Sequence, residues 1–325
     1  MESESVKETV GADGAKETEK VREESVTDSN GSTSSTKVAE KVVEDDESKL
    51  TSTRTESKDA SGKETSEKKV EAESKDGSVK SSVEVQKDGG PAEIVTVLGS
   101  GQSGGEISVS ADQVRLAVSL QEKVSGEIHD VQQEKVMLAE STTDRIPLTL
   151  SGEAMKGMSD SGAALNIVSS KGGLKVSKEV LGNLSGEDEV VIQFSASEEI
   201  SLSEDQKDAV GESASVLEIK VSSAGESLGG SINGVLTLVV KHVVAEGMVP
   251  AMYYVTDNGD MEKLEGSYDA ERQGMTGVTT HCSIYAVIDE DSNAGGDDVL
   301  IYVAAAIITI LAVATVAGYL HMRRS

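Results

Sequence analysis

The distribution of apolar side chains divides the chain into stretches of different character. Over residues 1–90, apolar residues are scattered singly among Glu, Lys, Ser and Thr, without any aromatic residue. Residues 91–288 carry short apolar runs separated by Gly, Asn and Asp. An acidic linker, 289–298, leads to the uncharged apolar run 299–320 and a basic tail, 321–325. The pattern predicts a polar tail, a folded domain and an anchor.

The first stretch carries a net negative charge, with 23 acidic and 15 basic side chains in residues 1–90. The tetrapeptide Glu-Ser-Lys-Asp occurs at 56–59 and again at 73–76. Such a composition buries too little apolar surface to offset the loss of chain entropy on folding. We therefore predict that residues 1–90 form a disordered, acidic, low-complexity tail.

The middle stretch is rich in β-branched residues, which favour strands. We predict a β-rich domain over residues 91–288, of the α+β class with mostly antiparallel strands. The expected strands are 93–98, 190–194, 216–221, 235–244, 252–255 and 283–288. A hairpin is expected around Lys171-Gly172-Gly173, from strands 164–169 and 174–176. Short helices are expected over 153–158 and 178–184, with Ser151 and Ser177 as N-caps.

The run 299–320 has the length and composition of a transmembrane helix. Its 22 uncharged residues would span about 33 Å, enough for a hydrocarbon core of about 30 Å. Arg323 and Arg324 follow the run and acidic residues precede it, so the positive-inside rule places the C-terminus in the cytoplasm and the domain outside. The opening residues, 1–10, show no signal-peptide pattern. The alternative is a tail-anchored cytoplasmic scaffold that recruits partners through its disordered N-terminus.

Net charge and cysteine content exclude nucleic-acid partners and intramolecular disulfide bonds, respectively. A net charge of −28 repels phosphate backbones, so nucleic acid is not expected as a partner. Cys282 is the single cysteine, which rules out an intramolecular disulfide bond.

The candidate catalytic sequence is His281-Cys282-Ser283. Neighbouring residues on a strand point to opposite faces, so a structural role is favoured over an activated thiol, although an envelope hydrolase or thiol enzyme is the rival interpretation. The four histidines show no metal-ligand spacing; they are His129, His242, His281 and His321. We predict no enzyme activity, no catalytic, cofactor-binding or metal-binding residues, no cofactor and no small-molecule substrate.

Three short motifs have more than one interpretation. Residues 99–104 match G-x-G-x-x-G, but a strand-like pattern follows at 106–110 where a dinucleotide site needs a helix, so a flexible turn is predicted. Asp257-Asn258-Gly259-Asp260 is predicted to be a hairpin turn and not a Ca²⁺ loop. Asn30-Gly31-Ser32 and Asn183-Leu184-Ser185 match the N-glycosylation sequon, which has meaning only outside the cytoplasm.

The second half of the domain resembles a β-rich module of bacterial and archaeal cell-surface proteins, often associated with S-layer-type modules and C-terminal anchors. The resemblance lies in residues 253–264, 267–270 and 279–287, which end in a Thr-x-His-x-Ser-x-Tyr strand. Cys282 stands where the pattern usually has Phe, and residues 271–274 replace a more polar turn. Including the similar segment 146–184, the resemblance covers most of residues 146–288. It implies an extracytoplasmic module for display or spacing.

These observations together predict a single-pass surface protein of the cell membrane with a structural, display or adhesive role. Its expected partners are the membrane itself and components of the cell envelope or other surface proteins.

Overall fold

The computed structural model describes residues 2–11, 14–86, 92–101, 106–129, 131–196, 200–228 and 231–291. Strands hold 58% of these residues and helices 15%, so the predicted α+β class dominated by antiparallel β structure is confirmed. The chain divides into two compact units. Unit 1 comprises Met1–Leu98 and Arg115–Val136, and unit 2 comprises Gly99–Val114 and Met137–Ser325. Residues 91–288, predicted as one domain, therefore contribute to both units.

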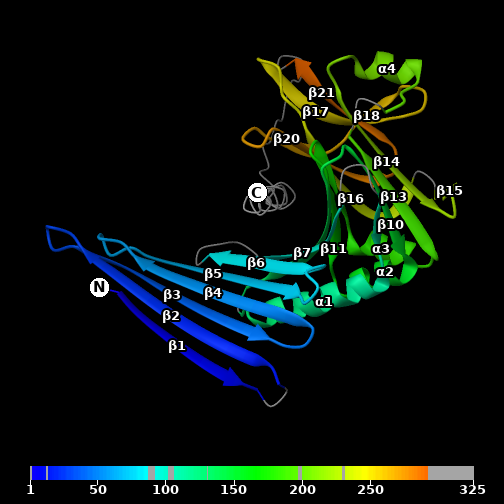
Figure 1. The fold of residues 1–325 in the computed structure, drawn as a ribbon. Coiled ribbons are helices and arrows are strands. Elements are labelled where there is room, and N and C mark those ends of the chain that lie inside the picture. Colours follow the sequence, from blue (N-terminus) through cyan, green and yellow to red (C-terminus); the bar gives the residue numbers. More distant parts are fainter. Residues whose placement is uncertain are drawn as a thin grey trace. The chain divides into compact units, whose positions relative to one another are not determined.

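The segment predicted to be disordered forms strands instead. Residues 2–86 fold into six antiparallel strands that follow one another in chain order, and β7 continues the series (Figure 1). The expectation of disorder considered apolar content alone and left out turn chemistry and cross-strand pairing. The strands are β1 (Glu2–Val10), β2 (Lys16–Thr27), β3 (Thr33–Glu44), β4 (Ser48–Lys58), β5 (Glu64–Ser74), β6 (Lys80–Gln86) and β7 (Ala92–Gly101). We call β1–β6 the meander.

The same turn joins β2 to β3 and β4 to β5. Gly31 and Gly62 have φ angles of +84° and +86°, which glycine adopts without steric cost. Their amides donate to the carbonyls of Asp28 and Asp59, three residues earlier. Each Asp carboxylate also accepts two backbone N–H groups of its own turn. The D-x-x-G sequence therefore closes the hairpins and fixes their register.

Helix α1 (Ala111–Gly126) lies against one face of the sheet in unit 1. Lys123 Nζ donates to Asp45 Oδ2 at 2.7 Å and to Ser48 Oγ at 2.6 Å. The core of unit 1 is apolar and comes from the inner strands and this helix; its buried members include Val70, Val83, Ile94, Leu98, Ala117, Leu120 and Val124. Burial therefore concentrates on β5–β7, and β1–β3 lie outside the core.

Unit 2 contains two sheets packed face to face. One has the strand order β11-β12-β16-β20-β19 and the other β18-β17-β21-β14-β13-β10-β8, with β15 beside β14. A Cβ atom added to Gly277 would lie 2.3 Å from Met252 Sδ of the opposite sheet, so glycine permits the close approach. Strand β9, Gln133–Ser141, begins in unit 1 and ends in unit 2. The other strands are β8 (Ile107–Val109), β10 (Arg145–Ser151), β11 (Ala164–Val168), β12 (Gly172–Val176), β13 (Glu189–Ser195), β14 (Ser215–Ser223), β15 (Glu226–Ser227), β16 (Ser231–Lys241), β17 (Met248–Val255), β18 (Met261–Lys263), β19 (Gly266–Asp269), β20 (Gly274–His281) and β21 (Ile284–Asp291).

The predicted local elements of unit 2 are confirmed, and one further helix is present. Ser151 and Ser177 cap α2 (Gly152–Asp160) and α3 (Lys178–Leu184). Strands β11 and β12 pair as the expected hairpin, and a turn joins β17 to β18 at residues 256–260. Helix α4 (Glu204–Val210) was not predicted, nor was α1.

Within the described residues, the helices are all too short or too polar to cross a bilayer. The apolar run 299–320, the linker from residue 292 onward and the basic tail 321–325 lie outside the described residues.

Candidate functional site

One face of the meander carries charged and hydroxyl side chains in rows that cross the strands. The strand registers align Ser3, Glu23, Lys37, Glu56 and Ser66 in one such row. Each interior member of this row is flanked by an opposite charge or a hydroxyl group. Opposite charges that face each other across strands contribute about 0.2–1 kcal/mol per pair. We call this surface the charged face.

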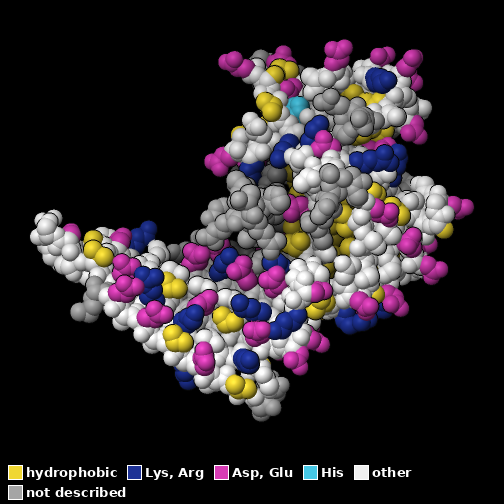
Figure 2. Space-filling model, viewed as in Figure 1, with side chains coloured by type: hydrophobic (Ala, Val, Ile, Leu, Met, Phe, Trp, Pro, Cys, Tyr) yellow, Lys and Arg dark blue, Asp and Glu magenta, His cyan; other side chains and the backbone are white. Residues whose placement is uncertain are grey.

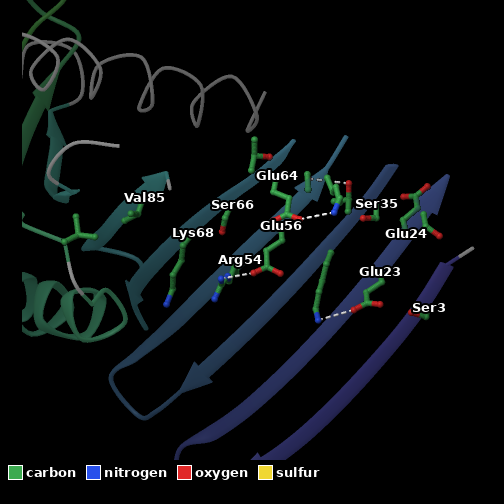
Figure 3. A pocket seen from close by; sticks show the side chains of 17 residues that line it. Ser3, Glu23, Glu24, Ser35, Arg54, Glu56, Glu64, Ser66, Lys68 and Val85 are labelled. Carbon is green, nitrogen blue, oxygen red and sulfur yellow. Dashed lines mark hydrogen bonds and ion pairs between the residues drawn. The ribbon is translucent and has the colours of Figure 1, made fainter. Parts of the chain in front are cut away.

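Ion pairs fix the side chains of the charged face, as Figure 3 shows. They are Lys37–Glu23 at 3.1 Å, Arg54–Glu56 at 2.7 Å and Lys58–Glu64 at 3.1 Å. Together with neighbouring Ser and Thr residues they line an open hollow of about 750 Å³. The space-filling view likewise shows both signs of charge interspersed over the meander (Figure 2).

The end of α1 borders the charged face. Lys68 Nζ donates to the backbone carbonyl of Glu127 at 2.5 Å and lies 3.5 Å from its carboxylate.

The Asp45 carboxyl, hydrogen-bonded to Lys123 of α1, has a lowered pKa. Burial tends to raise this pKa, but hydrogen bonds from Lys123 and two backbone amides outweigh it and lower the pKa to about 2. Asp45 is therefore ionised and held in place at any physiological pH.

The lining of the hollow indicates what it can bind. It contains four acidic side chains, four basic side chains and seven Ser or Thr residues. Such balance gives no net attraction for a simple anion or cation, whereas the hydroxyl and carboxylate groups offer many hydrogen bonds. The charged face is therefore suited to a polar, hydrogen-bonding partner over a wide area, and it resembles an interaction surface more than a reaction centre.

A second polar group lies inside unit 2. His242 Nδ1 is 2.9 Å from Ser215 Oγ, and His242 Nε2 is 2.9 Å from Asp289 Oδ1. Asp289 Oδ2 accepts the Ala245 amide at 2.8 Å, and the Tyr268 hydroxyl donates to the His242 carbonyl. The His242 side chain is only 4% exposed and that of Asp289 12%. We call Ser215, His242 and Asp289 the histidine clamp.

The clamp contains the residue types of a Ser-His-Asp triad in a different arrangement. In that triad Nε2 faces the serine and Nδ1 the aspartate, whereas here the two nitrogens are exchanged. Ser215 and Asp289 belong to β14 and β21 of one sheet, and His242 follows β16 of the other. The clamp therefore fastens the two sheets, and we assign it to the fold.

The Thr-x-His-x-Ser-x-Tyr sequence forms a closed hydrogen-bonded corner between β20 and β21. Tyr285 Oη lies 3.1 Å from Thr279 Oγ1 and donates to the His281 carbonyl at 2.5 Å. The His281 ring is exposed and stacks on Tyr254, with 5.7 Å between centroids. Burial raises the pKa of the Cys282 thiol to about 11, which keeps it protonated and poorly nucleophilic. These contacts favour a structural role for the motif.

The glycine-rich motif and the turn at 257–260 both belong to unit 2. Residues 99–101 end strand β7, and 102–105 lie outside the described residues. The turn at 257–260 is closed by the Gly259 amide donating to the Thr256 carbonyl. Among the described residues, no cluster of three His, Cys, Asp or Glu side chains is placed to hold a metal ion.

Sequence reasoning missed the residues of the charged face and the clamp. The alternation of Ser, Thr and Val with charged residues between D-x-x-G turns was the available signal for the meander. The clamp joins residues 27 and 47 positions apart, and no local pattern reveals such pairs.

Comparisons with known proteins found no matching family model, no matching curated protein and no matching solved structure.

Proposed function

We propose that this chain is a single-pass membrane-anchored protein of the cell surface, with a structural, display or adhesive role and no catalytic turnover. The observation that carries the proposal is the uncharged run 299–320, with acidic residues before it and Arg323 and Arg324 after it. This charge asymmetry favours a cytoplasmic C-terminus and an extracytoplasmic location for the folded units.

The charged face supports an interaction role for unit 1. The nine side chains of β1 are all exposed, and the twelve side chains of β2 are all exposed or half-buried. The outer strands thus present surface on both sides of a single sheet layer. A large polar area is suited to weak contacts with envelope components or neighbouring surface proteins, because its ion pairs remain hydrated at the rim of an interface.

The polar groups of unit 2 hold the fold together, which supports a role without catalytic turnover. The clamp and the Tyr285 corner satisfy their own hydrogen bonds within the fold, and the Cys282 thiol stays protonated. These groups stabilise the fold of unit 2.

Protease accessibility on intact cells tests the location. One epitope is placed in the turn at residues 59–62 and a second after Ser325, and protease is added before and after lysis. We expect the first epitope to be cleaved on intact cells while the second is protected. Survival of the first epitope until lysis would instead place the folded units in the cytoplasm and refute the proposal.

The adhesive role has its own test. Purified full-length chain in detergent micelles is added to isolated cell envelopes, and bound protein is measured by sedimentation. The variant with Lys37→Glu and Lys58→Glu reverses two charges of the charged face without touching the core. We expect weaker binding by this variant, and equal binding by variant and parent would exclude the charged face as the contact surface.

A further inference from the structure

The two Asn-x-Ser sequences lie in different structural settings. Asn30-Gly31-Ser32 occupies the tip of the β2–β3 hairpin, and Asn183-Leu184-Ser185 ends helix α3. An Asn-x-Ser sequence accepts an N-linked oligosaccharide when its carboxamide and hydroxyl groups reach the transferase. The two sites therefore differ in what must be broken before the acceptor is presented.

Both reactive groups of the first site are available. Asn30 and Gly31 are exposed, and Gly31 holds the turn open with a φ of +84°. The backbone amides of Asn30 and Ser32 donate to the Asp28 carboxylate at 2.8 and 2.9 Å. Among the described residues, neither Asn30 Nδ2 nor the Ser32 hydroxyl has a hydrogen-bond partner. The backbone of the turn is thus held by hydrogen bonds, while the Asn30 carboxamide and the Ser32 hydroxyl remain available.

Both reactive groups of the second site are engaged. Asn183 Nδ2 donates to the Asn233 carbonyl at 2.6 Å, and Ser185 Oγ donates to the Gly182 carbonyl at 2.7 Å. The residue between them, Leu184, is 9% exposed and belongs to the core. Presenting this sequon would break two hydrogen bonds, unwind the end of α3 and expose a buried leucine.

We infer that Asn30 is the N-glycan acceptor of the folded chain and that Asn183 is not. In the transfer, Asn30 Nδ2 forms a bond to the anomeric carbon of an oligosaccharide carried on a lipid phosphate. The bond from that carbon to the phosphate oxygen breaks, the lipid phosphate leaves with the electron pair, and the amide loses one proton to a base of the transferase. Use of the site in cells rests on the proposed extracytoplasmic location, whereas acceptor competence does not.

The test uses the full-length chain in detergent micelles, a purified oligosaccharyltransferase and its lipid-linked oligosaccharide. Trypsin releases Asn30 in peptide 23–37 and Asn183 in peptide 179–207, and mass spectrometry detects the intact glycopeptides. We expect modification of peptide 23–37 alone, with loss of modification in Ser32→Ala and no change in Asn183→Gln. Synthetic peptides 23–37 and 179–207 serve as unfolded controls, and both should be accepted. An unmodified Asn30 in the folded chain, or Asn183 modified to the same extent, would overturn the inference.

The sister turn provides a matched gain-of-function control. Asp59 accepts the amides of Ser61 and Lys63 as Asp28 does those of Asn30 and Ser32. Ser61→Asn with Lys63→Ser creates Asn-Gly-Ser in this turn, and we expect a new glycopeptide beginning at Asp59. Absence of this glycopeptide would refute the view that the turn geometry determines whether the asparagine is glycosylated.

Glycopeptide analysis of the chain from its own cells, read with the protease test, separates the two proposals. An unmodified Asn30 beside an externally cleaved epitope overturns the inference and leaves the proposed function intact. A protected epitope refutes the proposed function, and the purified reaction then decides the inference on acceptor competence.

Discussion

Removing the imidazole of the histidine clamp should destabilise unit 2. In His242→Ala, the Asp289 carboxylate keeps the Ala245 amide but loses its Nε2 partner, and Ser215 loses Nδ1. Leaving a buried donor or acceptor unsatisfied costs about 1–3 kcal/mol. Because Asp289 keeps some exposure and one hydrogen bond, we expect a loss of about 3 kcal/mol in the free energy of unfolding.

Tyrosine fluorescence reports this effect, since the chain has no tryptophan and the tyrosines among the described residues, Tyr253, Tyr254, Tyr268 and Tyr285, all belong to unit 2. Urea titration of the full chain in micelles gives the unfolding midpoint of unit 2. His281→Ala is the matched control, because His281 is exposed, and surface substitutions usually change stability by less than about 0.5 kcal/mol. Equal midpoints for the two variants would refute the view that the clamp fastens the sheets.

The pH dependence of stability, compared between the parent and His242→Ala, gives a second test. Burial tends to raise the pKa of the Asp289 carboxyl, but hydrogen bonds from the Ala245 amide and from His242 lower it below its ordinary value. A lowered pKa contributes stability that is present above the unfolded value, about 3.9, and is lost as the pH falls through the folded value. The gap in stability between the parent and His242→Ala should therefore narrow below about pH 4, and a gap that widens there would contradict the assignment.

Three further predictions concern other polar groups. Asn166 is fully buried, and its side-chain amide oxygen and nitrogen have no hydrogen-bond partner among the described residues. Asn166→Leu should therefore raise the stability of unit 2 by about 1–3 kcal/mol, and a lower urea midpoint would contradict this. Lys123→Met removes a hydrogen bond that holds the pKa of Asp45 at about 2, so carboxyl NMR should show this pKa rising toward 3.8. The parent loses a small amount of unit 1 stability between about pH 4 and 2, and the variant should lose less over the same range. Because burial raises the pKa of Cys282 to about 11, a thiol reagent at pH 8 should react slowly with the folded chain and rapidly in urea, and rapid reaction without urea would restore the thiol-enzyme alternative.

Local rules in the sequence predicted local structure where they were applied. Ser151 and Ser177 were recognised as N-caps, and both cap helices. The two missed helices begin with a capping box that the same reasoning could have found. Ser110 and Gln113 exchange hydrogen bonds before α1, and Ser203 and Gln206 do so before α4. An S-x-x-Q sequence before an apolar periodic segment is therefore an informative signal in this chain.

The meander shows why composition alone misjudged residues 1–90. A disorder argument asks whether a segment buries enough apolar surface, and β1–β3 bury very little. Their order comes instead from being built outward from β5–β7, whose Val70, Val83 and Ile94 form a core with α1. Each added strand then needs only a defined turn and cross-strand pairs, because the preceding strand already supplies a hydrogen-bonding edge.

Stability should consequently decline from β5 toward β1, since ion pairs at exposed positions contribute less than buried apolar contacts. The same decline increases the surface available for contact, because a strand that contributes nothing to the core is free to present both of its faces. Charged residues along the outer edge also discourage uncontrolled pairing with other strands. A sheet built in this way has lower stability at its edge and a larger polar surface, which is the combination that a display or adhesive segment requires.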